Sequence, residues 1–114
     1  MGERIQVKVT QEEQGLPDCP AVYAIFSANK CRFVGVTYYL QKRITGHFSP
    51  CEPNISLRYF MLSSKSKTLL YELIDEGSLN CIDMIRETWV GLYSPSDNEP
   101  SVECSRNPVL AGTR

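Results

Sequence analysis

Two short runs of β-forming residues, separated by a brief turn, constrain the fold of this chain more than any other feature. The first run, AVYAIFS, covers residues 21–27 and is nearly all apolar. The second run, CRFVGV, covers residues 31–36. The intervening ANK has the composition of a turn, in which Asn29 is able to adopt a positive φ. The pattern therefore predicts a β-hairpin whose first strand lies inside a sheet.

Regular patterns on both sides of this hairpin predict further elements. Residues 4–10 alternate polar and apolar side chains, which is typical of a half-buried strand. From Thr37 onward the apolar residues recur at helical spacing, which predicts a helix of about eleven residues with Thr37 as its N-cap. Residues 55–62 fit a strand or a helix equally well.

The second half of the chain carries one more helical and one more strand-like pattern. In residues 66–77, four apolar side chains form one helical stripe that ends at Gly77, so a helix is predicted there. Residues 79–91 alternate and predict a strand. Together these patterns indicate one domain, 1–114, of the α+β class, with a small, mostly antiparallel sheet of three to four strands flanked by helices.

The charge balance limits how such a domain could bind a partner. Lys and Arg number 12 against 13 Asp and Glu, so the formal net charge is −1 and binding of nucleic acid by bulk charge is excluded. Any nucleic-acid site would need a local cluster of cations, for which the candidates are Lys30, Arg32, Lys42, Arg43, Arg58, Lys65 and Lys67. No apolar run reaches the length of a membrane span, and residues 1–15 lack a signal-peptide core, so an intracellular, cytoplasmic location is expected.

The five cysteines favour free thiols over a structural site. Their number is odd and no Cys-x-x-Cys pair occurs, which argues against a disulfide framework and a zinc knuckle. His47 and Cys51 are four positions apart, but the other two ligands of a zinc site would have to come from scattered cysteines. Partly buried thiols in a reducing compartment explain the pattern better.

Residues 16–48 resemble the GIY-YIG nuclease domain, and most closely the version at the N-terminus of the bacterial excision-repair incision protein. The lead-in is Leu16, Pro17 and Pro20, the first triplet is Ala-Val-Tyr at 21–23, and the second is Phe-Val-Gly at 33–35. Thr37, Leu40 and Arg43 follow the second triplet, and Arg43 stands eight positions after Gly35, as in the family. The joint occurrence of these features is more specific than any one of them.

The resemblance implies a DNA endonuclease that hydrolyses a phosphodiester bond with one divalent metal, Mg²⁺ or Mn²⁺. Tyr23 would act as the base, Arg43 would hold the scissile phosphate, and His47, on the same helix face, would donate to phosphate or assist proton transfer. The residues implied to border the substrate are Phe33, Gly35, Thr37, Tyr39 and Lys42. DNA is the implied partner, and a homodimer would allow a domain with one site to cut two strands.

In the family the metal is bound by a Glu on a late helix, several residues before a Pro that an Asn often follows. Glu99 stands nine positions before Pro108, which fits that offset, so Glu99 is the expected metal ligand within a helix starting near Asp97 or Asn98 (segment 97–108). Glu103 is the fallback. Glu72 and Glu76 rank lower, and Ala111 stands where the Asn is expected.

Several departures from the family pattern leave other functions open. Ala21 replaces a Gly, Tyr39 replaces an Asn, and Phe33 has no hydroxyl where the family has a Tyr. These changes favour a second hypothesis, a GIY-YIG-fold module that has lost catalysis and binds DNA or a protein. A third hypothesis is an unrelated α+β domain in protein–protein contacts, in which Tyr23 only packs in the core and His47 is a surface residue at a helix end.

Overall fold

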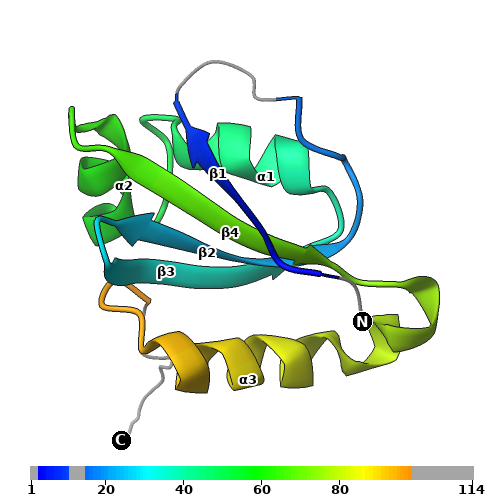
Figure 1. Ribbon diagram of the computed structural model, residues 1–114. Coiled ribbons are helices and arrows are strands. Elements are labelled where there is room, and N and C mark those ends of the chain that lie inside the picture. The colour runs from blue at the N-terminus through cyan, green and yellow to red at the C-terminus, as the bar shows by residue number, and fades with distance from the viewer. Residues whose placement is uncertain (1–2, 11–14, 99–114) are drawn as a thin grey trace, which may run out of the picture.

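The computed structural model describes residues 3–10 and 15–98 of the chain (Figure 1). A four-stranded antiparallel sheet has the order β1-β4-β2-β3, so β2 lies inside the sheet as predicted. The bounds of the elements are β1 Ile5–Val9, β2 Ala21–Ser27, β3 Lys30–Thr37, α1 Leu40–His47, α2 Ile55–Leu62, β4 Lys67–Leu73, the 3₁₀ helix η1 Glu76–Cys81 and α3 Ile82–Tyr93. The α+β class with a small antiparallel sheet is confirmed.

Helices cover both faces of the sheet. α1 and α2 pack on one face and α3 on the other (Figure 1). Side chains alternate between the faces along each strand, so Tyr23 and Ile25 of β2 join the α1–α2 core, while Val22 and Ala24 join the α3 core. No helix in the described parts of the chain is long and apolar enough to cross a bilayer.

The predicted hairpin is confirmed, with one correction at its turn. β2 and β3 pair antiparallel from Ala21↔Thr37 to Ser27↔Lys30, with a register shift after Ile25. The residue with positive φ is Ala28, at 55°, and not Asn29. Two residues are enough to close this hairpin, which is a common loop length between antiparallel strands.

Two predictions of secondary structure are wrong: a predicted helix is a strand, and a predicted strand is a helix. Residues 66–77, predicted as a helix, form strand β4 followed by the start of η1. β4 lies between β1 and β2 and is covered by helices on both faces, so its apolar residues fall at even and odd positions alike and imitate a helical stripe. Residues 79–91, predicted as a strand, belong to η1 and α3. Ile82, Ile85 and Trp89 of α3 meet the sheet at helical spacing.

The starts of the two helices on the other face follow from local hydrogen bonds. α1 begins at Leu40 and has eight residues, and its N-cap is Tyr39 without a side-chain cap, so the prediction of a longer helix capped by Thr37 is wrong. Thr37 Oγ1 instead accepts a hydrogen bond from the backbone N–H of Tyr39 (3.0 Å). Residues 55–62 are the helix α2, whose N-cap Asn54 accepts from the N–H of Leu57 (3.1 Å).

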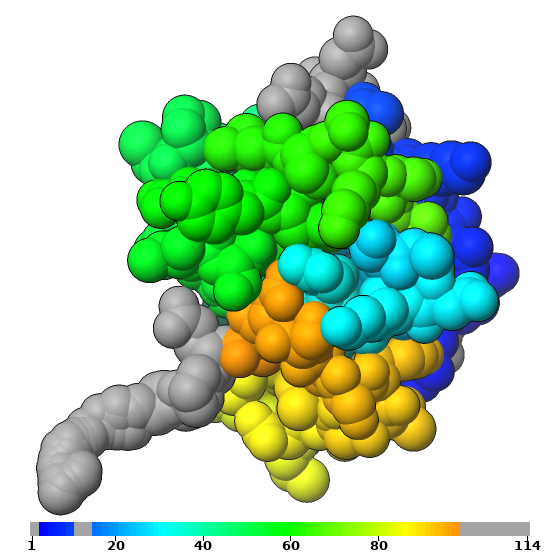
Figure 2. All heavy atoms as spheres, turned by 90° about the vertical axis from the view of Figure 1, so that its left-hand side faces the viewer, coloured from blue at the N-terminus to red at the C-terminus, as the bar shows by residue number. Residues whose placement is uncertain are grey.

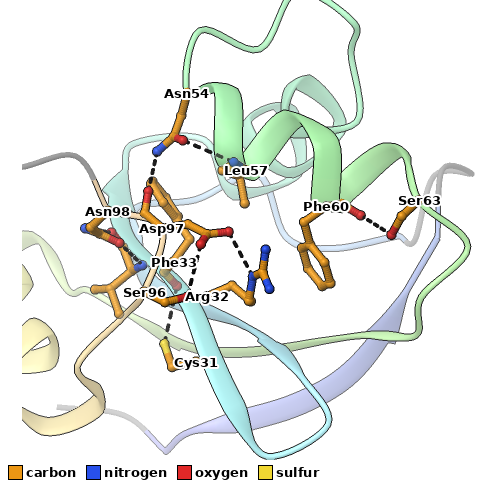
Figure 3. Close-up of polar contacts among 11 residues, drawn as sticks. Cys31, Arg32, Phe33, Asn54, Leu57, Phe60, Ser63, Ser96, Asp97 and Asn98 are labelled. Carbon is orange, nitrogen blue, oxygen red and sulfur yellow. Dashed lines mark hydrogen bonds and ion pairs between the residues drawn. The ribbon is translucent and has the colours of Figure 1, made fainter.

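The segment after α3 returns to the edge of the sheet. The side chain of Asn98 pairs with the backbone of Val34, accepting from its N–H (2.8 Å) and donating to its carbonyl (3.0 Å). Asp97 accepts from Arg32 Nε (2.8 Å), and Asn54 donates to the Asp97 carbonyl (2.7 Å) (Figure 3). The segment (orange) therefore fills the space between α2 and the β2–β3 hairpin (Figure 2). The described part of 97–108 is not helical, and the rest of that segment lies outside the described residues.

Candidate functional site

Tyr23 and Gly35 face each other across β2 and β3, and their contact explains why the second triplet ends in glycine. A Cβ added at Gly35 would lie 2.7 Å from Tyr23 Oη and 2.9 Å from a ring carbon of Phe33. Real Cβ contacts are longer than this, so the tyrosine ring occupies the space that a side chain at position 35 would need. Gly35 is therefore required by the position of the phenol, whatever its role toward substrate.

We expect Gly35→Ala to lower the free energy of unfolding by about 1–3 kcal/mol, since the added methyl group must displace a buried ring. Chemical denaturation followed by circular dichroism measures this. Gly91→Ala is the matched control, because a Cβ at this exposed position in α3 meets no atom within 4 Å and alanine favours the helix. A loss at Gly35 no greater than the change at Gly91 would contradict the contact.

The phenol of Tyr23 begins a buried series of hydrogen bonds. Tyr23 Oη lies 2.6 Å from His47 Nε2, and His47 Nδ1 lies 2.5 Å from Glu52 Oε1. The second carboxylate oxygen, Oε2, accepts from the backbone N–H of Asn54 (2.9 Å). An ionised carboxylate only accepts, so Nδ1 carries the imidazole proton and Nε2 accepts from the phenol. The three side chains are 1%, 3% and 8% exposed in chain order.

Burial opposes ionisation at both ends of the Tyr23–His47 pair. Burial raises the pKa of the Tyr23 phenol, and the nearby guanidinium of Arg43 opposes this rise only in part. Burial also lowers the pKa of His47, against the opposing effect of its hydrogen bond to Glu52. Near neutral pH the pair is therefore a neutral phenol donating to a neutral imidazole.

Phe33 covers this pair from β3. Its ring centroid lies 6.0 Å from that of Tyr23 and 5.2 Å from that of His47, the latter in an edge-on arrangement. The ring is partly buried and has no hydroxyl, so it supplies packing at the place where the family has a second phenol.

Above this series, α1 and the loop after it border an open cleft of about 440 Å³. Its lining includes the exposed cations Lys42 and Arg43, the hydroxyls of Thr37 and Ser49, and the ring of Tyr39. Within the described residues neither Lys42 nor Arg43 forms an ion pair. Glu52 also lines the cleft, whereas Tyr23 and His47 do not. Arg43 therefore faces solvent, while His47, four residues on, points into the protein.

Two other cations that the sequence offered for a local cluster, Arg32 and Lys67, form contacts within the protein. Arg32 pairs with Asp97 and lies 4.6 Å from the centroid of the Phe60 ring. Lys67 is buried and donates to the carbonyls of Ser63 and Lys65. Fewer of the seven candidate cations are therefore available at the surface than the sequence indicates. The positive charge of the cleft comes from Lys42 and Arg43.

The described residues do not assemble the donors of a metal centre. They contain no group of three or more His, Cys, Asp or Glu side chains placed to hold an ion. Glu72 lies opposite Val22 on the α3 side of the sheet and pairs with Arg4 (3.3 Å), away from Tyr23. Glu76 is exposed in η1. The expected ligand Glu99 and its fallback Glu103 lie outside the described residues.

The course of α3 gives a different position for the family's acid. α3 is the late helix, and Pro95 and Asn98 follow it in the order that the resemblance implies. Nine positions before Pro95 stands Arg86, which pairs with the neighbouring Glu87 (2.8 Å). The acid Glu87 stands one position later on α3, but it is exposed, pairs with Arg86 and belongs to no group of metal-binding side chains within the described residues, so α3 supplies no evident site for the metal that the resemblance implies.

Glu52 and Asn54 are not predicted from the sequence, and Asn98 is predicted only as a possible helix start. Glu52 and Asn54 stand in the irregular loop CEPN, where no periodicity marks them. Asn98 follows Pro95 by three positions, and the family has an Asn after the Pro that follows its late helix. This match could not be recognised while residues 79–91 were predicted as a strand, because the late helix α3 was then missing.

The topology defines an α+β fold with a four-stranded antiparallel sheet between helical layers, and comparisons with solved structures give its type. No family model and no curated protein sequence matches the chain. Crystal structures of the GIY-YIG N-terminal endonuclease domain of UvrC from Thermotoga maritima, two point mutants each bound to the catalytic divalent cation, do match. Each match covers 73% of this chain and 86% of the other, with a TM-score of 0.56 and 13% or 14% sequence identity. The chain therefore has a GIY-YIG-like fold.

Proposed function

We propose that this chain is a DNA-binding module with a GIY-YIG-like fold and an impaired hydrolytic centre. The observation that carries the proposal is the composition of the cleft. Its cations Lys42 and Arg43 have no ion-pair partner within the described residues, while the acid in its lining, Glu52, is hydrogen-bonded through both carboxylate oxygens. Cations without a metal-binding acid fit recognition of phosphate better than its hydrolysis.

The binding part of the proposal depends on the chemistry of the cleft. A guanidinium presents paired N–H donors that match two phosphate oxygens, and the ammonium of Lys42 adds a second charge one residue away. The hydroxyl of Ser49, which also lines the cleft, can donate to the same backbone. A net charge of −1 means that this contact would be local and sensitive to salt.

The impairment follows from three features of the buried series. Tyr23 is a poor base because burial raises the pKa of its phenol and its proton is directed at His47. Phe33 lacks the hydroxyl that would orient a water molecule. Both carboxylate oxygens of Glu52 already accept hydrogen bonds, from His47 and from the N–H of Asn54, which leaves this acid poorly suited to bind a cation.

A metal-dependent DNA endonuclease is the second candidate, and one observation favours it. The series from Tyr23 through His47 to Glu52 lies beneath Arg43, and it offers the phenol proton a path to Nε2 while Nδ1 keeps its proton against the carboxylate. Such an enzyme would use Mg²⁺ or Mn²⁺ with Glu99 as the metal ligand. Hydrolysis would then depend on Tyr23, Arg43 and Glu99 together.

Arg43→Ala is expected to weaken binding to a labelled DNA duplex by about tenfold or more, because it removes a charged hydrogen-bond donor to phosphate. The slope of log affinity against log salt should also fall by about one. Fluorescence anisotropy across a salt series measures both. Arg86→Ala is the matched control, since it removes the same charge from α3, on the opposite face of the sheet. Equal losses for the two variants would contradict binding at the cleft.

Supercoiled plasmid incubated with Mg²⁺ or Mn²⁺ separates the two candidates. We expect retardation of the DNA in a gel without nicking. Nicking that is lost in both Tyr23→Phe and Arg43→Ala would replace the binding module by the endonuclease. A chain that neither retards nor nicks DNA at low salt would refute both candidates.

A further inference from the structure

Two large aromatic side chains stand exposed at the entrance to α1. Tyr38 and Tyr39 connect β3 to α1, and they are 53% and 55% exposed. Tyr39 lines the cleft together with Lys42 and Arg43. No hydrogen bond of either phenol hydroxyl is found among the described residues, so the rings themselves are the feature presented to solvent.

The backbone beneath Tyr39 is fixed. Its N–H donates to Thr37 Oγ1 (3.0 Å), and its carbonyl accepts from the N–H of Arg43 (3.0 Å). The N–H of the next residue, Leu40, donates to the carbonyl of Cys19 (3.2 Å). The ring is thus held on a rigid connection, and the ammonium of Lys42 lies 5.1 Å from its centroid. A ligand that packs on this ring would cost little ordering of the protein.

The combination of cations with an exposed ring distinguishes between forms of nucleic acid. In a duplex the faces of the bases are stacked on each other, and only the backbone and the groove edges are accessible. In a single strand every base offers a face, and stacking on an aromatic side chain adds about 1–3 kcal/mol per base. A duplex would also demand a wide cationic surface, but Arg32 and Lys67 are engaged inside the fold.

Resting on the proposed function, we infer that the cleft binds single-stranded DNA in preference to duplex, with an unpaired base stacked on Tyr39 and the adjoining phosphate on Arg43. Lys42 would serve both contacts, since its ammonium lies beside the ring and at the cleft.

Fluorescence anisotropy with the full chain and a labelled oligothymidylate, compared with a duplex of the same length at the same salt, tests this. We expect tighter binding of the single strand. Tyr39→Ala should weaken binding of the single strand by about tenfold or more while leaving duplex binding within about twofold. Tyr39→Phe should retain the wild-type affinity, because stacking needs the ring and not the hydroxyl.

Tyr59→Ala is the matched control, because Tyr59 is 71% exposed on α2 and does not line the cleft. It should change neither affinity. Equal affinity for both forms of DNA, or a Tyr39→Ala variant that binds the single strand like wild type, would overturn this inference and leave the proposed function standing. Absence of binding to either form at low salt would overturn the proposed function and the inference together.

Discussion

Replacing Trp89 by alanine is expected to lower the free energy of unfolding by about 3–5 kcal/mol, the largest single effect in the α3 layer. Trp89 is 1% exposed and belongs to the buried cluster with Val22, Ala24 and Val34. Its ring also packs against Tyr93, with centroids 5.3 Å apart, and Arg4 lies 4.8 Å above it. Truncation would leave a cavity between α3 and the sheet and remove the partner of a cation.

Leu92→Ala is the control for this prediction, because Leu92 lies on the same helix and is 58% exposed. We expect a change within about 0.5 kcal/mol for this variant. Urea denaturation of both variants, monitored by far-UV circular dichroism because its signal does not depend on the tryptophan, gives the comparison. Similar effects at the two positions would show that α3 does not pack on the sheet through the face that contains Trp89.

Trp89 lies on α3, one of the two elements whose type was predicted wrongly, and both errors have a physical reason. The hairpin of β2 and β3 was predictable because its signal is local: two β-rich runs and a short turn. β4 is a central strand between two helical layers, so its buried and half-buried positions fall on both faces and remove the alternation by which a strand is recognised. For α3 the apolar residues also fit an alternating pattern over 79–91, and the helical period shows only when the sheet that they contact is known.

The residues of the candidate site likewise fall into two groups, those with a local sequence signal and those without one. Tyr23, Arg43 and His47 lie within a short stretch and carry a recognisable spacing, so sequence alone nominated them, and the structure brings all three to the α1 side of the sheet. Their roles toward a substrate stay predictions. Glu52, Asn54 and Asn98 depend on contacts between distant segments, such as Asn98 with Val34. No local pattern marks such residues before the chain is folded.

The exposed tyrosines illustrate what sequence left ambiguous about Tyr39. The resemblance implies that Tyr39 borders the substrate, because it follows the second triplet at the position where the family has an Asn. A tyrosine at a helix start is equally compatible with burial against the sheet. The structure shows the ring exposed at the cleft on a backbone that is fixed by hydrogen bonds, so the contribution that we propose for it is stacking.

Glu52→Ala is expected to lower the free energy of unfolding by about 2–5 kcal/mol, since two buried donors would lose their acceptor at once. These donors are His47 Nδ1–H and the backbone N–H of Asn54, at 2.5 Å and 2.9 Å from the carboxylate. Tyr23→Phe removes only the hydrogen bond at the other end of the series, so it should cost about 0.5–1.5 kcal/mol. The comparison measures whether the carboxylate anchors the series.

Glu76→Ala controls for the loss of an acid, because Glu76 is exposed in η1 and makes no ion pair among the described residues. It should change the unfolding free energy by no more than about 0.5 kcal/mol.

His47 is the single histidine of the chain, so its imidazole nitrogen signals in NMR are unambiguous. In wild type they should report a neutral ring protonated at Nδ1, with a pKa below the usual 6.5, since burial lowers it. Glu52→Ala should lower that pKa further, because the hydrogen bond that supports the charged ring is gone. A ring protonated at Nε2 in wild type would mean that the phenol does not donate to His47, and the proton path that favours the endonuclease would be lost with it.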